Sequence, residues 1–519
     1  MNADLAQHVL DQLREAGVAE ICVCPGGRNA PWVELLAAPA SPFKVTWHFE
    51  ERAAAFFALG RTRATGLPVA VCTTSGTAAG ELLPATMEAF YSGLPLMLLT
   101  ADRPRRFRGS GAPQAAEQRG MFGVYTVGAF DLELDERLDL SGFDITSPVH
   151  INVCFEEPIG TTTGPSVVGD QAPTENPGRV LTHFLQSVQH PLVVLGGLTS
   201  AERPVVERFL LTLGAPVYAE ALSGLRESVA LESLQLNVGD RLFERAAAGG
   251  YPIDGVLRIG GVPIHRFWRD LEDKLAKLPV VSVSKLPFSG LGRKSALCCG
   301  NVPELLSNAA AVSGQRTAQG VVASDRQVAD RLKAILEDER RSEAGMFHAL
   351  SKRIEPGATV FLGNSLPVRE WDLAGTWDWR GYEVLASRGL NGIDGQVSTF
   401  LGMCKPVAAN WAILGDLTTL YDLAGPWIMG QLDASVQATI VVVNNAGGRI
   451  FERMFAAPEF LNKHILAFDK WAEMWGLTYQ LCHSVDEISM YASGFRVVEL
   501  RPDAEATARF WRRYQECLA

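Results

Sequence analysis

The sequence lacks the features that would place it in a membrane, on nucleic acid or in a disulfide-stabilised fold. It has no uninterrupted apolar run of the roughly 18–20 residues that a membrane-spanning helix needs. Acidic residues outnumber basic ones by 58 to 47, and the net charge of −11 disfavours a general nucleic-acid or anionic-membrane surface. There is no paired C-x-x-C motif, and the nine cysteines are odd in number and lie mostly in apolar runs. We therefore expect buried, reduced thiols in a cytoplasmic protein.

A complete dinucleotide-binding fingerprint is also missing. Glycine pairs at 196–197 and 260–261 follow apolar, strand-like runs, but neither continues as G-x-G-x-x-G. We interpret both as tight turns between a strand and a helix. The first residues, MNADLAQHVLDQLREAG, have the amphipathic spacing of a helix and contain acidic residues, which is not typical of a signal peptide.

What the sequence does contain is an alternation of strand-like and helical patterns. Its 519 residues, 47% hydrophobic and 20% charged, are enough for two or three globular domains. The alternation predicts the α/β class, with three doubly wound parallel-sheet domains. We place the first domain at 1–160, a Gly-, Thr- and Pro-rich linker at 161–185, a central domain at 186–325 and a third domain at 340–519. Helices are predicted at 3–16, 50–64, 77–92 and 325–352.

Two strand-like runs of the third domain end in polar residues that suit a metal ion. VAANWAIL (407–414) leads into Gly415-Asp416, and ATIVVV (438–443) leads into Asn444-Asn445, with 29 positions between Asp416 and Asn445. This spacing is typical of a strand-helix-strand unit, and open α/β sheets bind ligands at such strand ends. Carboxylate, amide and backbone carbonyl oxygens suit Mg²⁺ that also contacts phosphate. Taken alone, Asp416 is equally suited to capping the following helix.

A second acidic pair lies early in the chain. The run VTWHF leads into Glu50-Glu51-Arg52 and an Ala- and Phe-rich helix, so both glutamates lie at a strand-to-helix junction. Acidic residues are favoured at a helix N-terminus by the macrodipole, and this role is sufficient to explain Glu50.

Together these segments resemble thiamine diphosphate (ThDP) enzymes, whose diphosphate-binding motif begins with Gly-Asp and ends with Asn-Asn at a similar distance. Within that class the chain is similar to the 2-succinyl-5-enolpyruvyl-6-hydroxy-3-cyclohexene-1-carboxylate (SEPHCHC) synthase family of menaquinone biosynthesis. The matching blocks span most of the chain: CPGGRNAPW, HFEERAAAFFALG, TTSGTA, LTADRPRRFRGSGAPQA, GNSLPVREWD, SRGLNGIDG, GDLTTLYDL and NNAGGRIF. The chain departs from the family at Gly27, where serine is usual, and at the larger Leu390.

The resemblance implies a pyrimidine-binding first domain and a diphosphate-binding third domain, with ThDP and Mg²⁺ or Mn²⁺ as cofactors. Glu51 matches the catalytic glutamate that contacts the aminopyrimidine ring, and a buried carboxyl with a raised pKa suits a shared proton. Asp416, Asn445 and the carbonyl of Gly447 match the metal ligands. The implied cofactor contacts are Glu51, Ser365, Ile393, Gly415, Asp416, Leu417, Asn445, Gly447, Ile450 and Phe451.

The same resemblance implies the reaction and its substrates. 2-Oxoglutarate is decarboxylated, and the resulting succinyl carbanion equivalent adds to isochorismate in a Stetter-like 1,4-addition, giving SEPHCHC and CO₂. Both substrates are dianions, and arginine recognises carboxylates through a bidentate fork. The implied substrate contacts are Arg28, Arg103, Gln114, Arg266, Asn364, Arg369 and Arg388. We interpret Arg105, Arg106 and Arg108 instead as parts of a solvated loop.

The resemblance also implies a homodimer or dimer of dimers, in which Glu51 of one subunit meets Asp416 and Asn445 of another. Two alternatives remain open. The first is another ThDP-dependent 2-oxoacid decarboxylase or carboligase, which would act on small or apolar oxoacids and would not need four arginines. The second is a catalytically silent ThDP-fold binding subunit, which the intact Glu51, Asp416 and Asn445 disfavour.

Overall fold

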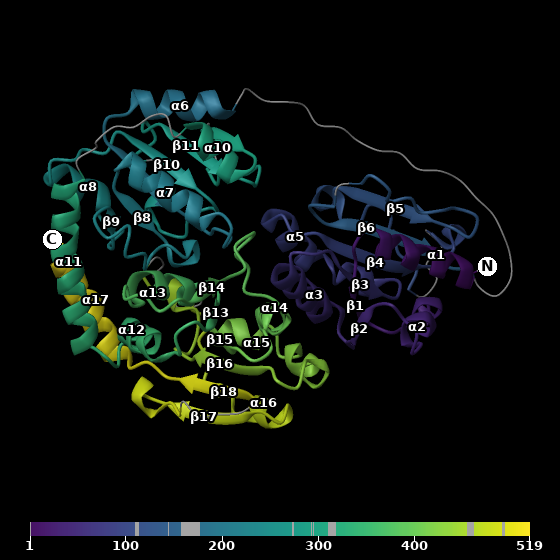
Figure 1. Ribbon diagram of the computed structural model, residues 1–519. Helices are drawn as coiled ribbons and strands as arrows, with labels where there is room; N and C mark the ends of the chain where they lie inside the picture. The colour runs from purple at the N-terminus through teal and green to yellow at the C-terminus, as the bar shows by residue number, and fades with distance from the viewer. Residues whose placement is uncertain are drawn as a thin grey trace.

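The computed structural model describes residues 2–108, 114–143, 145–156, 177–271, 274–291, 293, 295–309, 318–453, 461–489 and 494–518. These residues form three α/β domains, each built on a six-stranded sheet (Figure 1). The first domain is drawn in purple and blue, the central domain in teal, and the third in green and yellow. The predicted fold class is therefore confirmed.

The first domain has strands β1 (Glu20–Val23), β2 (Lys44–Trp47), β3 (Val69–Thr73), β4 (Leu96–Asp102), β5 (Gly128–Leu132) and β6 (Val149–Cys154). They are parallel and follow the order β2-β1-β3-β4-β6-β5. The helices are α1 (Asn2–Glu15), α2 (Ala30–Ala37), α3 (Glu51–Thr65), α4 (Thr77–Gly80) and α5 (Leu83–Ser92). The single helix predicted at 77–92 is wrong, because Pro84 has no N–H and its ring conflicts with the carbonyl four residues earlier.

The third domain repeats this topology. Its strands are β13 (Thr359–Leu362), β14 (Glu383–Leu385), β15 (Ala409–Gly415), β16 (Gln437–Val443), β17 (Thr478–Cys482) and β18 (Phe495–Leu500). The order β14-β13-β15-β16-β18-β17 matches that of the first sheet strand for strand, and all pairs are parallel. The helices are α12 (Glu343–Arg353), α13 (Leu366–Ala374), α14 (Gln396–Met403), α15 (Asp416–Leu420), α16 (Asp469–Met474) and α17 (Ala504–Leu518).

The central domain has a different strand order, β12-β11-β10-β7-β8-β9. Its parallel strands are β7 (Pro191–Leu195), β8 (Val217–Ala219), β9 (Gln235–Leu236), β10 (Gly255–Ile259), β11 (Val280–Ser284) and β12 (Ala296–Cys299). Its helices are α6 (Pro177–Ser187), α7 (Arg203–Leu213), α8 (Leu242–Ala248), α9 (Phe267–Asp270), α10 (Val302–Ala309) and α11 (Gln319–Asp338). In chain order this is the 3-2-1-4-5-6 arrangement of dinucleotide-binding sheets.

The glycine pairs form the two turns at the strand ends where such a sheet would bind a dinucleotide. They follow β7 and β10, the neighbouring strands at which the strand order reverses. Gly261 donates its backbone N–H to Gly197 O at 3.0 Å, and a Cβ atom on Gly196 would collide with Gly261 O. The two turns therefore pack directly on one another, which agrees with their interpretation as tight turns.

Two predicted segments differ from the structure. Of the linker predicted at 161–185, residues 161–176 lie outside the described residues, and the rest belongs to α6, whose Leu181 and Leu185 are fully buried in the central core. The single helix predicted at 325–352 is two helices, α11 and α12. Ser342 caps α12 by accepting a hydrogen bond from Gly345 N at 3.0 Å, and this cap starts a new helix.

The cysteines are mostly buried, as predicted. Eight of the nine free cysteines are buried and Cys299 is exposed. Among the described helices, none combines the length and the apolar character needed to cross a membrane.

The first and third domains share a core within one chain. Helix α3 lies against α14, and one cluster of buried side chains includes Phe56 and Phe57 of α3 together with Phe400 and Leu401 of α14. The contact needs glycine at position 60, since a Cβ atom there would collide with the carbonyl of Thr399. The helix that begins with Glu51 is thereby fixed to the domain that carries Asp416.

Candidate functional site

Two cavities contain most of the residues that the sequence singled out. The first, about 620 Å³, lies at the N-terminus of α3 and is lined by Glu51, Gln114 and Tyr421 among others. The second, about 440 Å³, lies at the carboxyl ends of β15 and β16 and is lined by Asp416 and Asn445 among others. No residue lines both. In the described part of a single chain, Glu51 and Asp416 therefore belong to separate cavities.

The two glutamates at the start of α3 have different structural roles. Glu50 is the N-cap, and its carboxylate accepts hydrogen bonds from Arg52 N at 3.1 Å and Ala53 N at 2.9 Å. Glu51 is the first helical residue and lines the first cavity. Burial raises the pKa of the Glu51 carboxyl, and the negative charges of Glu50 and Glu81 raise it further. This chain thus has a helix cap at Glu50 and a carboxyl suited to holding a proton at Glu51.

The first cavity is also lined by Gln114 and by the turn that carries Thr77. Gln114 lines the cavity in a left-handed conformation, with φ of 56°. The fully buried Gln118 accepts a hydrogen bond from Gly76 N at 2.8 Å and donates one to Asn152 Oδ1 at 2.8 Å. Gln118 therefore fixes the turn that carries Thr77, a role that no motif of the sequence indicated.

Asp416 begins α15 at the end of β15 and is 3% exposed. Its Oδ1 accepts from Leu417 N at 2.7 Å, and its Oδ2 accepts from Gly447 N at 2.9 Å. His464 Nε2 lies 3.1 Å from the same Oδ2. Burial raises the pKa of the Asp416 carboxyl, and the two backbone N–H groups oppose this by favouring the ionised form. The carboxylate is thus held at the strand ends, directly beside Gly447.

The side-chain amide of Asn445 is hydrogen-bonded at one end only, among the residues that the structure describes. Its Nδ2 donates to both carboxylate oxygens of Glu343 at 3.1 Å, and its backbone oxygen accepts from Arg449 Nε at 3.0 Å. Among the described residues, Oδ1 of Asn445 is buried without a hydrogen bond. Leaving such an atom unsatisfied costs about 1–3 kcal/mol. A buried carboxylate and an orphaned amide oxygen are ligands of the kind that Mg²⁺ takes, so these residues fit the implied metal.

Other predicted cofactor contacts surround these two. Ser365, Ile393, Gly415, Leu417, Gly447, Ile450 and Phe451 all line the second cavity, as does the predicted substrate contact Arg369. Ser365 adopts φ of 71° at the start of α13, a left-handed conformation that is unusual for a residue with a side chain. Glu343, Leu390, Asn391, Arg449 and Asn462 also line this cavity and were not predicted as contacts.

The side-chain polar atoms of Asn364 are hydrogen-bonded within the protein. It is fully buried, and its Nδ2 donates to Ser387 O and to Gly392 O, both at 2.7 Å. Its Oδ1 accepts from Arg388 Nη1 at 2.8 Å. Burial and the like charge of Arg369 lower the pKa of the Arg388 guanidinium to about 10. Asn364 therefore supports the loop that carries Arg388, and two guanidinium groups lie close enough to disfavour each other's charge.

Five predicted substrate contacts line neither cavity in the described part of the chain: Asn364 and Arg388, described above, and Arg28, Arg103 and Arg266. Arg28 lies beyond β1, where its backbone N donates to Thr74 Oγ1 at 3.2 Å. Arg103 follows β4, with its guanidinium 5.4 Å from the centre of the Phe107 ring. Arg266 is exposed just before α9. Their contacts with substrate stay predictions.

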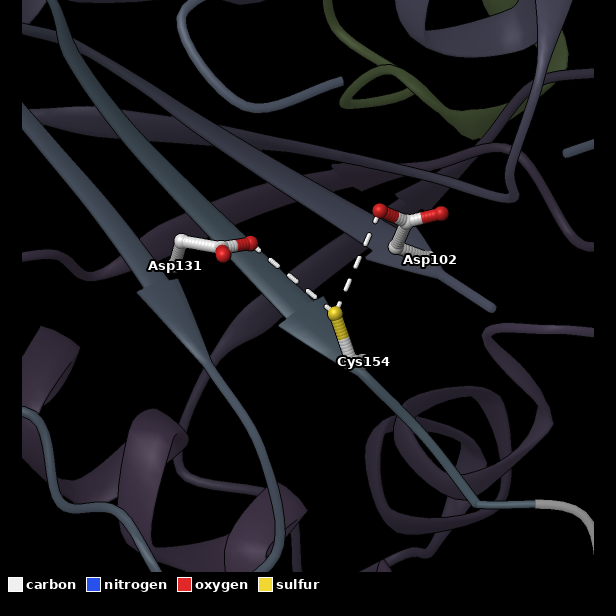
Figure 2. Close-up of side chains that lie close together, drawn as sticks. All are labelled: Asp102, Asp131 and Cys154. Atoms are coloured by element: carbon white, nitrogen blue, oxygen red, sulfur yellow. Dashed lines mark hydrogen bonds between the residues drawn. The ribbon is translucent and has the colours of Figure 1, made fainter. Parts of the chain in front are cut away.

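A separate acidic cluster lies at the carboxyl ends of β4, β5 and β6 of the first sheet. Figure 2 shows Asp102 and Cys154, at the ends of β4 and β6, with Asp131 of β5 beside them. Their ligand atoms lie within 4.8 Å of one another. The guanidinium of Arg108 already occupies this position, since its Nη2 is 3.1 Å from Asp102 Oδ2, 2.6 Å from Asp131 Oδ1 and 3.3 Å from Cys154 Sγ. The cluster therefore already binds a cation, which is an arginine side chain.

This arrangement corrects the interpretation of two arginines as parts of a solvated loop. Arg108 is paired with Asp102 and Asp131, and Arg105 pairs with Asp131 at 3.0 Å and with Glu136 at 2.7 Å. Asp102 lies at the end of β4, whereas Asp131 and Glu136 lie on and after β5, an edge strand that the sequence pattern did not reveal. Arg106, whose side chain is about half exposed beside Glu156, does agree with the solvated interpretation.

Comparison with known proteins agrees with this geometry. Residues 3–121 match the family model described as thiamine pyrophosphate enzyme, N-terminal TPP binding domain. The chain is 42% identical over 524 residues to a SEPHCHC synthase of Bdellovibrio bacteriovorus, covering 99% of this chain and 98% of the relative. It is 39% identical to the SEPHCHC synthase of Akkermansia muciniphila, with 97% of each chain covered. The solved benzoylformate decarboxylase of Polynucleobacter necessarius shares the fold, with a TM-score of 0.67, 15% identity and coverage of 96% of this chain and 98% of that one.

The three sheets, the N-terminal family match and the two cavities define a thiamine diphosphate-dependent enzyme. Because relatives of 39–42% identity align over nearly the whole chain, the particular group is also settled. The chain belongs to the 2-succinyl-5-enolpyruvyl-6-hydroxy-3-cyclohexene-1-carboxylate synthase family, which are ThDP-dependent transferases of menaquinone biosynthesis.

Proposed function

We propose that this chain decarboxylates 2-oxoglutarate and transfers the remaining four-carbon unit to isochorismate by 1,4-addition, giving SEPHCHC and CO₂, with Mg²⁺ or Mn²⁺ as its metal. The name of the full-length relatives supports the product. One observation carries the cofactor site: a buried carboxylate at Asp416 lies at the same sheet edge as the orphaned amide oxygen of Asn445.

The metal is held by Asp416, Asn445 and the carbonyl oxygen of Gly447. These residues follow β15 and β16, which are paired in register up to Gly415 and Val443. An oxygen-only ligand set leaves positions for phosphate oxygens and water, as Mg²⁺ prefers. Gly447, with φ of 135°, lets the backbone take a path that a residue with a side chain rarely adopts.

ThDP, when bound, supplies the carbanion chemistry of decarboxylation and transfer. The carboxyl of Glu51 shares a proton with the cofactor's aminopyrimidine ring, which its raised pKa favours. Ile393 and Leu417 supply apolar surface to the cavity that holds the diphosphate end. Apolar walls keep water from the reacting carbon and strengthen the charge interactions there.

Substrate carboxylates are bound by arginine. Arg369 and Arg388 lie close together, and a dianion between them would relieve the repulsion that lowers the pKa of Arg388. Asn364 acts through Arg388, since its own polar atoms are already bonded. The remaining contacts in this proposal are Arg28, Arg103, Gln114 and Arg266.

A complete site requires a second copy of the chain. Glu51 and Asp416 line separate cavities, so we assign each active site to the first domain of one subunit and the third domain of its partner. Beside the Glu51 cavity is an exposed apolar surface made of Phe49, Tyr421, Leu423 and Trp427, in which Phe49 is 56% exposed. Exposed apolar patches of this kind mark interaction surfaces. Sedimentation should therefore give a dimer or a dimer of dimers.

One incubation tests this function. The protein is mixed with ThDP, Mg²⁺, 2-oxoglutarate and isochorismate, and the product is identified by mass. SEPHCHC is the expected product, and none should form without isochorismate. A response of the circular dichroism of the ThDP-loaded protein to pyruvate instead of 2-oxoglutarate would indicate a decarboxylase of small oxoacids. No response to either oxoacid would indicate a silent binding subunit.

A further inference from the structure

Glu343 lies next to the proposed metal ligand Asn445, and it belongs to none of the motifs identified in the sequence. It is the first residue of α12, 4% exposed, and it reaches Asn445 across 102 positions of sequence. Both of its carboxylate oxygens are 3.1 Å from Asn445 Nδ2. Its backbone N–H donates to Thr507 Oγ1 at 3.0 Å, so the start of the helix is also fixed from α17. The carboxylate is thus anchored at its helix and aimed at one nitrogen.

The contact decides which way the Asn445 amide faces. A side-chain amide has a donor end and an acceptor end of similar shape, and a half-turn exchanges them. A carboxylate accepts hydrogen bonds and donates none, so it holds the nitrogen end toward itself. The oxygen end must then face the opposite way, and it is this Oδ1 that lacks a partner among the described residues. A half-turn would present N–H groups to a cation and would destroy the site.

We propose that Glu343 is a positioning residue for the metal, which fixes the Asn445 amide so that Oδ1 faces the cation. This inference rests on the proposed function, because it takes Asn445 as a metal ligand. Groups that hold a ligand in this way change metal affinity by about 10–100-fold when they are removed. Glu343 lines the same cavity, and in this assignment it acts through Asn445 and not on the reacting groups.

The first test compares Mn²⁺ binding in the presence of ThDP, followed by the loss of the free-ion electron paramagnetic resonance signal. Glu343→Gln has nearly the same shape, but its own amide can face Asn445 with either end, so the orientation is no longer fixed. We expect its Mn²⁺ dissociation constant to rise about 10–100-fold. Thr507→Val is the matched control, because it disturbs the start of α12 without touching Asn445, and its Mn²⁺ affinity should be that of the wild type.

A double substitution separates orientation from charge. In an Asn445→Asp background both ends of the side chain are oxygens, so there is no orientation left to fix. Adding Glu343→Gln to that background should then leave Mn²⁺ affinity unchanged within about twofold or tighten it, because the glutamine N–H groups can donate to the new carboxylate. If Glu343 acted only through its negative charge, the glutamine would weaken Mn²⁺ binding equally in both backgrounds, and the inference would be overturned.

A third variant distinguishes this failure from that of the proposed function. Asp416→Ala should abolish Mn²⁺ binding under the same conditions. If Asp416→Ala binds Mn²⁺ normally, the metal site itself is misplaced. If Asp416→Ala loses binding but Glu343→Gln matches the wild type, the metal site stands and the positioning role of Glu343 is wrong.

Discussion

Glu88 of the first domain accepts a hydrogen bond from the backbone N–H of Leu390 in the third domain, at 2.8 Å and across 302 positions of sequence. Its other oxygen accepts from Gly389 N at 2.9 Å. Arg63, on the helix that begins with Glu51, donates to the carbonyl of Ala386 at the start of the same loop. The loop that carries Arg388 and Ile393 is therefore fastened to the first domain of its own chain.

Glu88→Ala should loosen this loop. The carboxylate is 5% exposed, and its loss leaves the N–H groups of Gly389 and Leu390 without an acceptor. Hydrogen bonds to charged groups contribute about 1.5–3 kcal/mol, so the melting temperature should fall and ThDP should bind more weakly as Ile393 loses support. Thermal melting and ThDP titration measure the two effects. Glu34→Ala, which removes an exposed carboxylate from α2 of the same domain, is the control and should change neither.

Glu51→Gln should remove most turnover and leave folding and ThDP binding nearly intact. The glutamine cannot hold and release the proton that the cofactor ring needs, and one acid-base contribution is worth about 10²–10⁴ in rate. Steady-state kinetics at saturating ThDP measure the loss. Retention of more than half of the wild-type rate would contradict the assignment.

Glu50→Gln should show the reverse pattern. Glu50 caps α3 through Arg52 N and Ala53 N, and glutamine is a poorer cap. Its loss should lower the unfolding free energy by about 1 kcal/mol and leave kcat close to that of the wild type. Two variants at adjacent positions thus separate the proton-holding role from the structural one.

Asp416→Ala should abolish the thermal stabilisation that ThDP and Mg²⁺ give together. A ligand that binds only the native state stabilises it by about 2.7 kcal/mol at a hundredfold excess over its dissociation constant. Without the carboxylate the metal is lost, and the diphosphate is left without its main counter-charge. Differential scanning calorimetry with and without the ligands checks this. The exposed Asp433 provides the control, since Asp433→Ala should keep the full shift.

The stability of the first domain should depend on the neutral state of His150. This residue is 1% exposed, its Nε2 lies 2.8 Å from Thr100 Oγ1, and burial lowers its pKa to about 3. The unfolded chain takes up a proton near pH 6.5 and the folded chain does not, so stability is full above that pH and falls as the pH drops toward 3. Relative to His150→Gln, the wild type should lose about 1.4 kcal/mol for each pH unit in this window. Urea unfolding at several pH values tests it, and parallel pH profiles for the two proteins would contradict it.

The fold class and much of the proposed site could be predicted from the sequence. A buried parallel strand appears there as an apolar run, and the residues expected to bind a ligand directly follow the end of that run. Asp416 and Asn445 follow such runs, and the structure places them at one sheet edge in register. One edge strand, β5, escaped prediction. The strand β5 (Gly128–Leu132) is short and only partly buried, so Asp131 gave no sign that it pairs with Arg108.

Glu343 could not have been found from the sequence. An acidic residue in the first turn of a helix is common and is explained by the macrodipole, so its presence predicts nothing further. Its contact with Asn445 depends on the packing of α12 against the third sheet, which no local pattern encodes. The same is true of Asn364, which the motif marked as a substrate contact and the structure shows bonded to Arg388 and its loop.

Arg369 and Arg388 should control substrate efficiency and leave ThDP affinity near normal. Arg369 lines the cavity that contains Asp416, and the guanidinium of Arg388 donates a hydrogen bond to Asn364. Removing an arginine opposite a buried carboxylate costs about 2–5 kcal/mol, which is roughly 30- to several-thousand-fold in kcat/KM. Each alanine variant should lose efficiency chiefly toward the substrate that it contacts, and each lysine variant should recover only part, because an ammonium group cannot form the bidentate fork.

The measurement that decides this is kcat/KM for 2-oxoglutarate and isochorismate in Arg28→Ala, Arg103→Ala, Arg369→Ala and Arg388→Ala. The exposed Arg512 of α17 is the control, and its alanine variant should match the wild type for both substrates. For each variant, the substrate whose kcat/KM falls more is the dianion that the arginine binds. If all four variants kept their efficiency within about threefold, less than the 1.36 kcal/mol that corresponds to a factor of ten, these arginines would bind no substrate carboxylate.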